Sequence, residues 1–452
     1  RTSEPQLAST FAQGEESGSF GAVPTVLSPP VEVIAPIDRV SPTVRRGDSV
    51  RVEVVVRTRK VGHFFPGGTV DAFDVWVELE ARDDSGREVY HSGYIERDGP
   101  VESGAHFYKS FLLDAHGNPI NIPPGAADTV HYRLRIPEDC GGTIRLRAKV
   151  NYRKFSWWNT QWAFAGVRDP ADPRPSVGPG HDDGKWIFTG DTSSVSGGIK
   201  AIPSIPTTVM SSAEATLKVA AKGAALPADA PVLDKSVRER WNDYGIGLLL
   251  QGDLKGAEAA FEKVTVMEPD YADGWVNVGR ARIQEGNMEG AEEVLRRALE
   301  KDPALAKTHF FLATALKARG RYDEALAHLR TAAERYPRDR VVRNQIGRVL
   351  FLKRQYKEAI TELQKALETD PEDLQAHYNL MLCWQGLGDV DKARRAQALY
   401  VRFKADESAQ AITGPYRQLH PDDNNERQAI HEHRTAVPSP APPPRGYSGA
   451  GR

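Results

Sequence analysis

Hydrophobic and polar residues alternate with a period of two through the N-terminal third of the chain. The run SVRVEVVVRT at 49–58 places four valines on one side of an extended strand, and FDVWVELEARD at 73–83 repeats the pattern. Two more alternating runs, DTVHYRLRIP at 128–137 and GTIRLRAKVNY at 142–152, flank a glycine-containing turn and are expected to pair with each other. The pattern therefore predicts that the N-terminal part consists of short strands.

The spacing of these strands indicates their arrangement, because no helical period separates them. Such a series is typical of an antiparallel β-sandwich of the immunoglobulin-like type. We assign this sandwich domain, with its edge and linker segments, to residues 29–220. Residues 1–28 have few apolar positions and are expected to form an extended arm, and residues 221–237 are expected to be a linker.

From residue 238 the apolar period changes to that of a helix, and a repeat of 34 residues begins. Pro269, Pro303, Pro337 and Pro371 each stand 34 residues after the last. Gly or Ala occupies the eighth position of the first four units, where a small residue lets paired helices approach closely. The proline lies in the loop after the second helix of each unit, where it cannot break a helix.

This pattern closely resembles the tetratricopeptide repeat (TPR) family, whose unit is a helix–turn–helix of about 34 residues. The resemblance implies an all-α superhelical solenoid over residues 238–405, so the chain is expected to be multidomain, β then α. Its five repeats are expected at 238–271, 272–305, 306–339, 340–373 and 374–405.

The resemblance also implies a binding surface, because TPR superhelices bind an extended peptide or a partner helix in an inner groove. The residues that would line this groove on the first helix of each unit mix apolar, aromatic and basic groups. They are Asn242, Ile246, Leu249, Val276, Arg280, Ile283, Phe310, Thr314, Lys317, Asn344, Arg348, Phe351, Tyr378 and Gln385. The pattern by which some relatives clamp a C-terminal carboxylate is not matched, since Ile246 replaces an expected Asn. The alternative is a groove that the chain's own tail fills.

Residues 406–452 become proline-rich and are expected to form an extended tail. Three histidines are weak candidates for metal ligands. His63 lies in VGHFFPGG, where the Pro-Gly-Gly predicts a turn between two strands. His431 and His433, in the tail segment IHEH, are two residues apart and so lie on different faces of a helix. We interpret His63 as structural and IHEH as a segment that docks the tail onto the TPR units or the sandwich. No metal or other cofactor is expected on this chain.

Composition excludes several classes of function. The formal net charge is −2, which gives no overall field that favours nucleic acid or an anionic membrane. No run approaches the roughly 18 apolar residues of a membrane span. Two cysteines, Cys140 and Cys383, exclude a disulfide framework, an iron–sulfur cluster and C-x-x-C-H haem attachment. No hydrolase, metalloprotease, P-loop or dinucleotide motif occurs, so we expect that the chain is not an enzyme.

The order of VGHFFPGG, the run VWVELEARDDSGREVYHSG, the TPR units and ERQAIHEH resembles a more specific group. It is similar to the C-terminal half of bacterial extracytoplasmic multihaem-cytochrome/TPR proteins, without the haem motifs. This resemblance implies a periplasmic or extracellular location. The leading hypothesis is a protein–protein interaction and assembly scaffold that binds an extended segment in the TPR groove. One form of it is self-assembly into an oligomer or filament through the terminal arm or the tail.

Two other functions stay open. The chain could be a subunit of an electron-transfer system that contacts haem supplied by another chain, a multihaem cytochrome. The histidines that would face such a haem are His63, His91, His106, His116 and His131. Alternatively, the cluster of Trp157, Trp158 and Trp162 could stack against a sugar in a carbohydrate-binding module, or could close the sandwich or pack at the interdomain joint.

Overall fold

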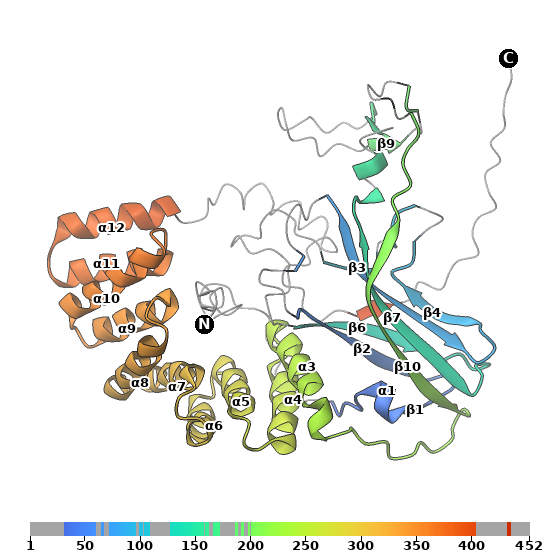
Figure 1. Ribbon diagram of the computed structural model, residues 1–452, viewed down its shortest axis with the longest axis horizontal. Helices are drawn as coiled ribbons and strands as arrows, with labels where there is room; N and C mark the ends of the chain where they lie inside the picture. Colours follow the sequence, from blue (N-terminus) through green and yellow to red (C-terminus); the bar gives the residue numbers. More distant parts are fainter. Residues whose placement is uncertain are drawn as a thin grey trace, which may run out of the picture.

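A computed structural model describes a strand-rich region followed by an array of helices (Figure 1). The residues that it describes are 31–59, 65–66, 72–95, 99–102, 104–108, 127–157, 159–161, 166–171, 186–188, 191–193, 198, 200–403 and 432–434. Among these residues, no helix combines the length and the apolar character that crossing a membrane would require. Both cysteines, Cys140 and Cys383, are free thiols and are buried.

The strand-rich region contains two main sheets. The larger has the order β1-β10-β7-β3-β4, with β5 also paired to β3. Its strands are β1 (Thr43–Arg45), β3 (Asp74–Asp83), β4 (Glu88–Ser92), β5 (His106–Phe107), β7 (Thr143–Arg153) and β10 (Thr207–Ala220). The smaller sheet has the order β11-β6-β2 and consists of β2 (Ser49–Arg57), β6 (Ala127–Arg135) and β11 (Glu432–Arg434). A short helix, α1 (Ile37–Val40), and a separate pair, β8 (Gly166–Arg168) with β9 (Trp186–Phe188), complete this region.

One apolar core lies between the two sheets. Val77 and Leu79 from β3 and Ile144 from β7 are buried against Tyr132 and Leu134 from β6. These residues occupy alternate positions on their strands, so each strand directs one side into the core. The β-rich N-terminal region predicted from the alternation is thus confirmed. Its assignment to the immunoglobulin-like type stays a prediction.

The hairpin expected between the strands at 128–137 and 142–152 is wrong. β6 pairs with β2 and β11, whereas β7 pairs with β3 and β10, so the two runs belong to opposite sheets. Both strands bury their apolar side in the same core, and they therefore face each other across it instead of lying edge to edge. The sheets are also not wholly antiparallel, since β1 pairs with β10 and β11 pairs with β6 in parallel.

The helical array follows a short 3-10 helix, η2 (Lys235–Val237), and consists of consecutive helix pairs. Its helices are α3 (Arg238–Leu250), α4 (Leu254–Met267), α5 (Ala272–Gln284), α6 (Met288–Lys301), α7 (Ala306–Ala318), α8 (Tyr322–Arg335), α9 (Arg340–Leu352), α10 (Tyr356–Thr369), α11 (Leu374–Gly386) and α12 (Val390–Phe403).

The small eighth residue of a unit has the packing role that the sequence suggested. A Cβ added to Gly245 of α3 would lie 2.5 Å from the ring of Phe261 on α4. A Cβ added to Gly279 of α5 would lie 2.6 Å from Leu295 on α6. These distances are too short for carbon atoms, so a larger residue would push the paired helices apart.

The segment predicted as a linker, 221–237, is attached to both regions. Asp229 accepts a hydrogen bond from the backbone N–H of Thr43 at the start of β1 (2.7 Å). The Val232 N–H donates to the carbonyl of Ala35, while the Val232 carbonyl accepts from the indole of Trp241 on α3 (3.1 Å). The segment therefore connects the strand-rich region to the first helix through specific contacts.

Candidate functional site on the first helices of the array

The residues predicted to line a TPR groove all lie on the first helices of the pairs, α3, α5, α7, α9 and α11. Most of them keep some exposed surface, and Tyr378 on α11 is 38% exposed. Four are buried instead: Leu249, Val276, Phe310 and Asn344. Those four pack the helices and offer little side-chain surface to a partner.

Basic residues on this surface extend from one unit toward the next. The guanidinium of Arg280 on α5 lies 5.4 Å from the ring centre of Phe311 on α7, a cation–π distance. On its own helix, Arg280 donates to the side-chain oxygen of Asn277 (2.9 Å), and Asn277 donates to Asn242 on α3 (2.8 Å). This arrangement fixes the Arg280 head group between two consecutive units.

The same pattern continues in the next two units. The Lys317 Nζ on α7 donates to the side-chain oxygen of Gln345 on α9 (2.5 Å). Arg348 on α9 approaches the side-chain oxygen of Asn379 on α11 (3.5 Å), and its guanidinium lies 5.2 Å from the ring centre of Phe351. We call Arg280, Lys317 and Arg348 the basic ladder, because each reaches toward the first helix of the following unit.

Sequence reasoning missed the residues that receive these cations. They occupy the sixth position of consecutive units and are Asn277, Phe311, Gln345 and Asn379. Their spacing of 34 residues is visible in the sequence, but the residues predicted to line the groove stand at other positions of the unit. The contacts show that the sixth position belongs to the same surface.

The charges of Lys317 and Arg348 in the basic ladder are poorly balanced. Burial, together with the nearby Arg348, lowers the pKa of Lys317 below that of an ordinary lysine. Among the described residues, no carboxylate forms an ion pair with Lys317 or with Arg348. Other basic groups of the array are compensated, as where Glu292 on α6 pairs with Arg319 and Arg321 (both 2.6 Å). Lys317 and Arg348 therefore form a local excess of positive charge among the described residues.

The first helix of the array also packs on the smaller sheet, and Gly247 permits this contact. A Cβ added to Gly247 of α3 would lie 2.3 Å from the hydroxyl oxygen of Thr129 on β6 and 3.0 Å from its backbone nitrogen. Figure 1 shows α3 beside β6 and β2, at the point where the two regions meet. No side chain larger than hydrogen fits between α3 and the backbone of β6.

A polar network joins the two regions around Gly247. The Tyr244 hydroxyl on α3 donates to Glu53 on β2 (2.6 Å). His131 on β6 is 3% exposed and lies between Glu53 (2.9 Å) and the side-chain oxygen of Gln251 (2.8 Å). Burial acts to raise the pKa of Glu53, but the hydrogen bonds from His131 and Tyr244 hold it below its ordinary value. The face of β6 that carries His131 is therefore the junction with α3.

Asp128 anchors the other side of this junction. One of its oxygens accepts from the Gln251 amide (2.9 Å), and the other accepts from Tyr108 (3.0 Å) and faces His106 (3.0 Å). Burial acts to raise the pKa of Asp128, yet the hydrogen bonds from His106, Tyr108 and Gln251 lower it to about 2. The ionised carboxylate is therefore part of the folded junction.

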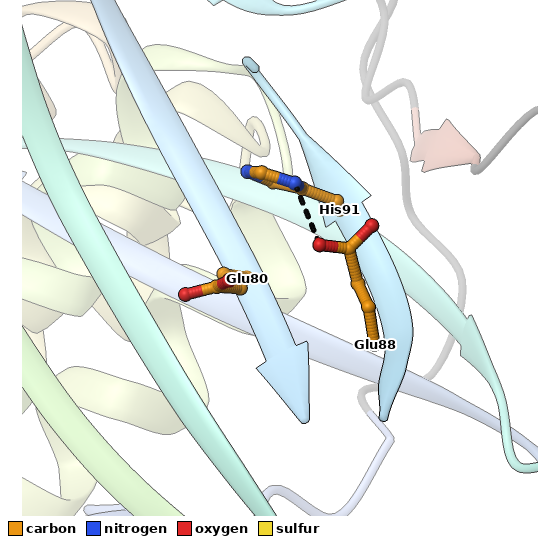
Figure 2. Close-up of side chains that lie close together, drawn as sticks. All are labelled: Glu80, Glu88 and His91. Carbon is orange, nitrogen blue, oxygen red and sulfur yellow. Dashed lines mark ion pairs between the residues drawn. The ribbon is translucent and has the colours of Figure 1, made fainter. Parts of the chain in front are cut away.

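A second polar cluster lies on β3 and β4 (Figure 2). Glu80, Glu88 and His91 direct their ligand atoms to within 4.8 Å of one another, the group of described residues whose geometry could hold a metal ion. Arg82 already contacts both carboxylates, with its guanidinium 3.0 Å from Glu88, and His91 faces Glu88 at 3.1 Å. Because Arg82 and His91 compensate the two carboxylates, we interpret this cluster as an ion-pair network and assign no metal to it.

The three histidines predicted as weak metal candidates can be placed only in part. His63 and His431 lie outside the described residues. The backbone of His433 belongs to β11 and pairs with Tyr132 of β6. This pairing agrees with the interpretation that IHEH docks the tail onto the sandwich. Of the tryptophan cluster, Trp158 and Trp162 also lie outside the described residues.

Comparison with known proteins agrees with the helical repeat. Models of the tetratricopeptide repeat match residues 248–307 and 282–348, and a TPR repeat model matches residues 347–380. The chain therefore contains tetratricopeptide repeats, a class of repeat that serves in protein interaction. No curated protein sequence matches the chain.

Several solved structures are similar to part of the chain. MamA from Desulfovibrio magneticus is 18% identical with a TM-score of 0.35, over 38% of this chain and 97% of that one. YrrB, described as a TPR protein with an unusual peptide-binding site, is 19% identical with a TM-score of 0.33, over 40% and 96%. PilF from Pseudomonas aeruginosa is 20% identical with a TM-score of 0.36, over 42% and 87%.

Proposed function

We propose that this chain is a non-enzymatic protein-interaction scaffold whose first-helix surface binds an extended, acidic segment of a partner protein. The proposal takes the helix pairs α3–α12 as five TPR units. It also places the scaffold outside the cytoplasm, as the resemblance to extracytoplasmic TPR proteins implies. The strand-rich region then serves as a second body that fixes the position of the first repeat.

The basic ladder is the observation that carries this proposal. Lys317 is held in a partly buried position where its charged form is disfavoured, and no described carboxylate offsets that cost. A carboxylate of a bound segment would remove the imbalance, because an opposite charge favours the protonated amine. Arg348 would offer a second contact of the same sign. An acidic segment is therefore expected to bind this surface more tightly than a neutral or basic one.

Peptide binding tests the proposal directly. Labelled extended peptides of equal length, with repeating Glu-Ser, Lys-Ser or Gly-Ser sequence, are titrated with the full chain and followed by fluorescence anisotropy. We expect binding of the Glu-Ser peptide only, with an affinity that falls as salt rises. The double substitution Arg280→Glu/Arg348→Glu is expected to weaken that binding by at least about tenfold.

The matched control makes the same change of charge elsewhere in the array. Arg330 on α8 and Arg394 on α12 lie on exposed positions of second helices. The double substitution Arg330→Glu/Arg394→Glu should leave binding of the Glu-Ser peptide within about twofold. Equal loss in both double variants would mean that overall charge, and not the first-helix surface, governs binding. Absence of Glu-Ser binding in the unmodified chain would contradict the acidic preference.

A further inference from the structure

Residues 404–431 connect the last helix of the array to a strand that lies beside its first helix. The last helix, α12, ends at Phe403, whose ring stacks on a histidine ring of α11 with 5.6 Å between the ring centres. The chain returns to the smaller sheet as β11, where Glu432 is paired with His131 of β6. His131 in turn is hydrogen-bonded to Gln251, which follows α3 (2.8 Å). Both ends of the connection are therefore fixed beside first helices, one at each end of the array.

A direct path between these two ends crosses the first helices α5, α7 and α9, which carry the basic ladder. Packed helices lie about 8–10 Å apart, so the steps from α11 back to α3 amount to about 40 Å. Figure 1 shows that the array curves between its ends, with α12 and the smaller sheet on the same side of α6 and α8. A connection of the length of residues 404–431 can extend over about 90 Å, which exceeds this span. The connection is therefore long enough to pass over the basic ladder.

The connection carries an acidic stretch that no basic residue interrupts. Residues 418–426, with sequence QLHPDDNNE, contain Asp422, Asp423 and Glu426 but no lysine or arginine. We call these residues the acidic stretch. Carboxylates are the groups that the first-helix surface lacks, because two cations of the basic ladder have no described carboxylate as an ion-pair partner. The charges of the acidic stretch and of the basic ladder are therefore complementary.

The acidic stretch is close enough to β11 along the chain to reach those cations. Asp422 stands ten residues before Glu432, so its distance from β11 is at most about 36 Å. Lys317 and Arg348 lie on α7 and α9, two and three steps along the first helices from α3, which corresponds to about 20–30 Å. The attachment of β11 to β6 therefore keeps the acidic stretch within reach of the basic ladder.

We propose that the acidic stretch occupies the first-helix surface of its own chain, and that an acidic segment of a partner must displace it in order to bind. This inference rests on the proposed function, because it takes the basic ladder as the site that binds acidic segments. A tethered segment acts at an effective concentration in the millimolar range, so even weak contacts compete with a free partner. Self-occupancy therefore lowers the affinity of the scaffold for partners that are weakly acidic and selects those that bind tightly enough to displace the stretch.

Binding of the labelled Glu-Ser peptide to the full chain tests the proposal. The triple substitution Asp422→Asn/Asp423→Asn/Glu426→Gln removes the negative charges of the acidic stretch. We expect this variant to bind the peptide at least about fivefold more tightly than the unmodified chain, because the competing carboxylates are gone. Equal binding by the two chains would overturn self-occupancy and leave the proposed function standing. If neither chain binds the peptide, the proposed function itself fails.

The matched control makes the same change of charge on the second-helix side of the array. Glu358 and Glu368 on α10 and Glu372 just after it are exposed. The triple substitution Glu358→Gln/Glu368→Gln/Glu372→Gln should alter binding of the Glu-Ser peptide by less than about twofold. An equal gain in both triple variants would mean that overall charge, and not displacement of the acidic stretch, sets the affinity, and would overturn the proposal.

Cysteine cross-linking locates the acidic stretch without any peptide. Both native cysteines are buried, so introduced thiols react in preference to them. Asn424→Cys is combined either with Thr314→Cys, on the first helix α7, or with Thr361→Cys, on the exposed side of the second helix α10. We expect a short bismaleimide to join the two cysteines within one chain for the pair with Thr314→Cys only, as identified by mass spectrometry of the digested protein. Cross-linking of both pairs, or of neither, would contradict occupancy of the first-helix surface.

Deleting residues 1–28 distinguishes another possible occupant of the first-helix surface, the N-terminal arm, which contains Glu4, Glu15 and Glu16. Because the acidic stretch is held near the basic ladder from both ends of its connection, we expect the deletion to leave binding of the Glu-Ser peptide within about twofold. A gain of at least about fivefold from the deletion, with no gain from neutralising the acidic stretch, would assign the surface to the arm and overturn the proposal.

Discussion

The two ends of the helical array are completed in different ways. At the first end, the tenth residue of the unit is Gly247, which meets the backbone of β6. In the later units the tenth residue is buried within the helical core itself, and the residues concerned are Ala281, Ala315, Val349 and Cys383. The smaller sheet therefore occupies the place that a preceding helix pair has in the interior of the array.

At the last end, no such cover is present among the described residues. Val390 and Val401 of α12 are 56% and 62% exposed, and Leu399 is 37% exposed. Repeat arrays need terminal elements that differ from the interior units, because an end unit has a neighbour on one side only. Here a sheet closes one end and a helix with exposed apolar residues forms the other. The comparison teaches that the strand-rich region is a structural part of the repeat array, not a separate attachment.

Among the tests of this comparison, Gly247→Leu is expected to have the largest effect on stability. The new side chain would meet Thr129 and the β6 backbone, so we expect a loss of about 3 kcal/mol in the free energy of unfolding, measured with urea. The control Ala318→Leu adds the same kind of bulk at an exposed helix end and should change stability by less than about 0.5 kcal/mol. Equal, small effects of both substitutions would mean that α3 and β6 are not tightly joined.

The next largest effect is expected from low pH, which should weaken the junction between α3 and β6. The pKa of Asp128 is about 2 in the fold, against 3.8 for the free group. Its depressed pKa means that the stabilisation is present above pH 4 and is lost as the pH falls toward 2, an effect of about 2 kcal/mol. We expect urea unfolding of Asp128→Asn to lack this part of the pH dependence. If the variant and the unmodified chain lose stability in parallel between pH 4 and 2, Asp128 does not hold the junction.

Between the two ends of the array, substitution of Lys317 is expected to raise the free energy of unfolding, and by a smaller amount than the changes above lower it. Because its pKa is lowered from 10.5, its charged form destabilises the fold at neutral pH. Lys317→Met should therefore raise the free energy of unfolding by about 0.5–2 kcal/mol. The advantage of Met should shrink as the pH rises through the lowered pKa toward 10.5. The same variant should bind the Glu-Ser peptide less well. If Lys317→Met is less stable than the unmodified chain at neutral pH, the charge of Lys317 stabilises the fold, and binding is not needed to explain it.

The smallest effect is expected at the last helix. The double substitution Leu399→Ser/Val401→Ser replaces exposed apolar side chains, so the free energy of unfolding should change by no more than about 0.5 kcal/mol. The interior change Ala396→Leu, at a residue that is 7% exposed, serves as the comparison and should cost about 1–3 kcal/mol. A large loss from the exposed pair would show that something covers this end in solution.

Much of the fold could be predicted from local sequence patterns. Alternation identified which side of β3 is buried, and the 34-residue period identified the helix pairs and the role of Gly245. Strand partners could not be predicted, because a period of two shows which face is buried but not which strand lies alongside. The junction was also hidden, since Gln251 is 120 residues from His131 and 123 residues from Asp128 in the sequence, and it meets them only after the sheet and α3 have formed.

The residues of the candidate site could likewise be predicted only in part. The basic residues of the ladder were predicted from their positions on the first helices. Their receiving residues at the sixth position were not, because the contact runs between units and depends on how consecutive helices are spaced. The imbalance of charge at Lys317 could not be judged either, since it requires knowing which carboxylates lie nearby in space.

The parallel pairing of β11 with β6 has a consequence for how the protein can be divided. The chain leaves the strand-rich region before α3, completes the helical array at Phe403, and returns to the same sheet at Glu432–Arg434. A boundary drawn at residue 237 therefore does not separate two independent modules. An N-terminal fragment cut there would lack one strand of its sheet and expose the edge of β6. Cloning and truncation of this protein should treat residues 31–434 as one unit.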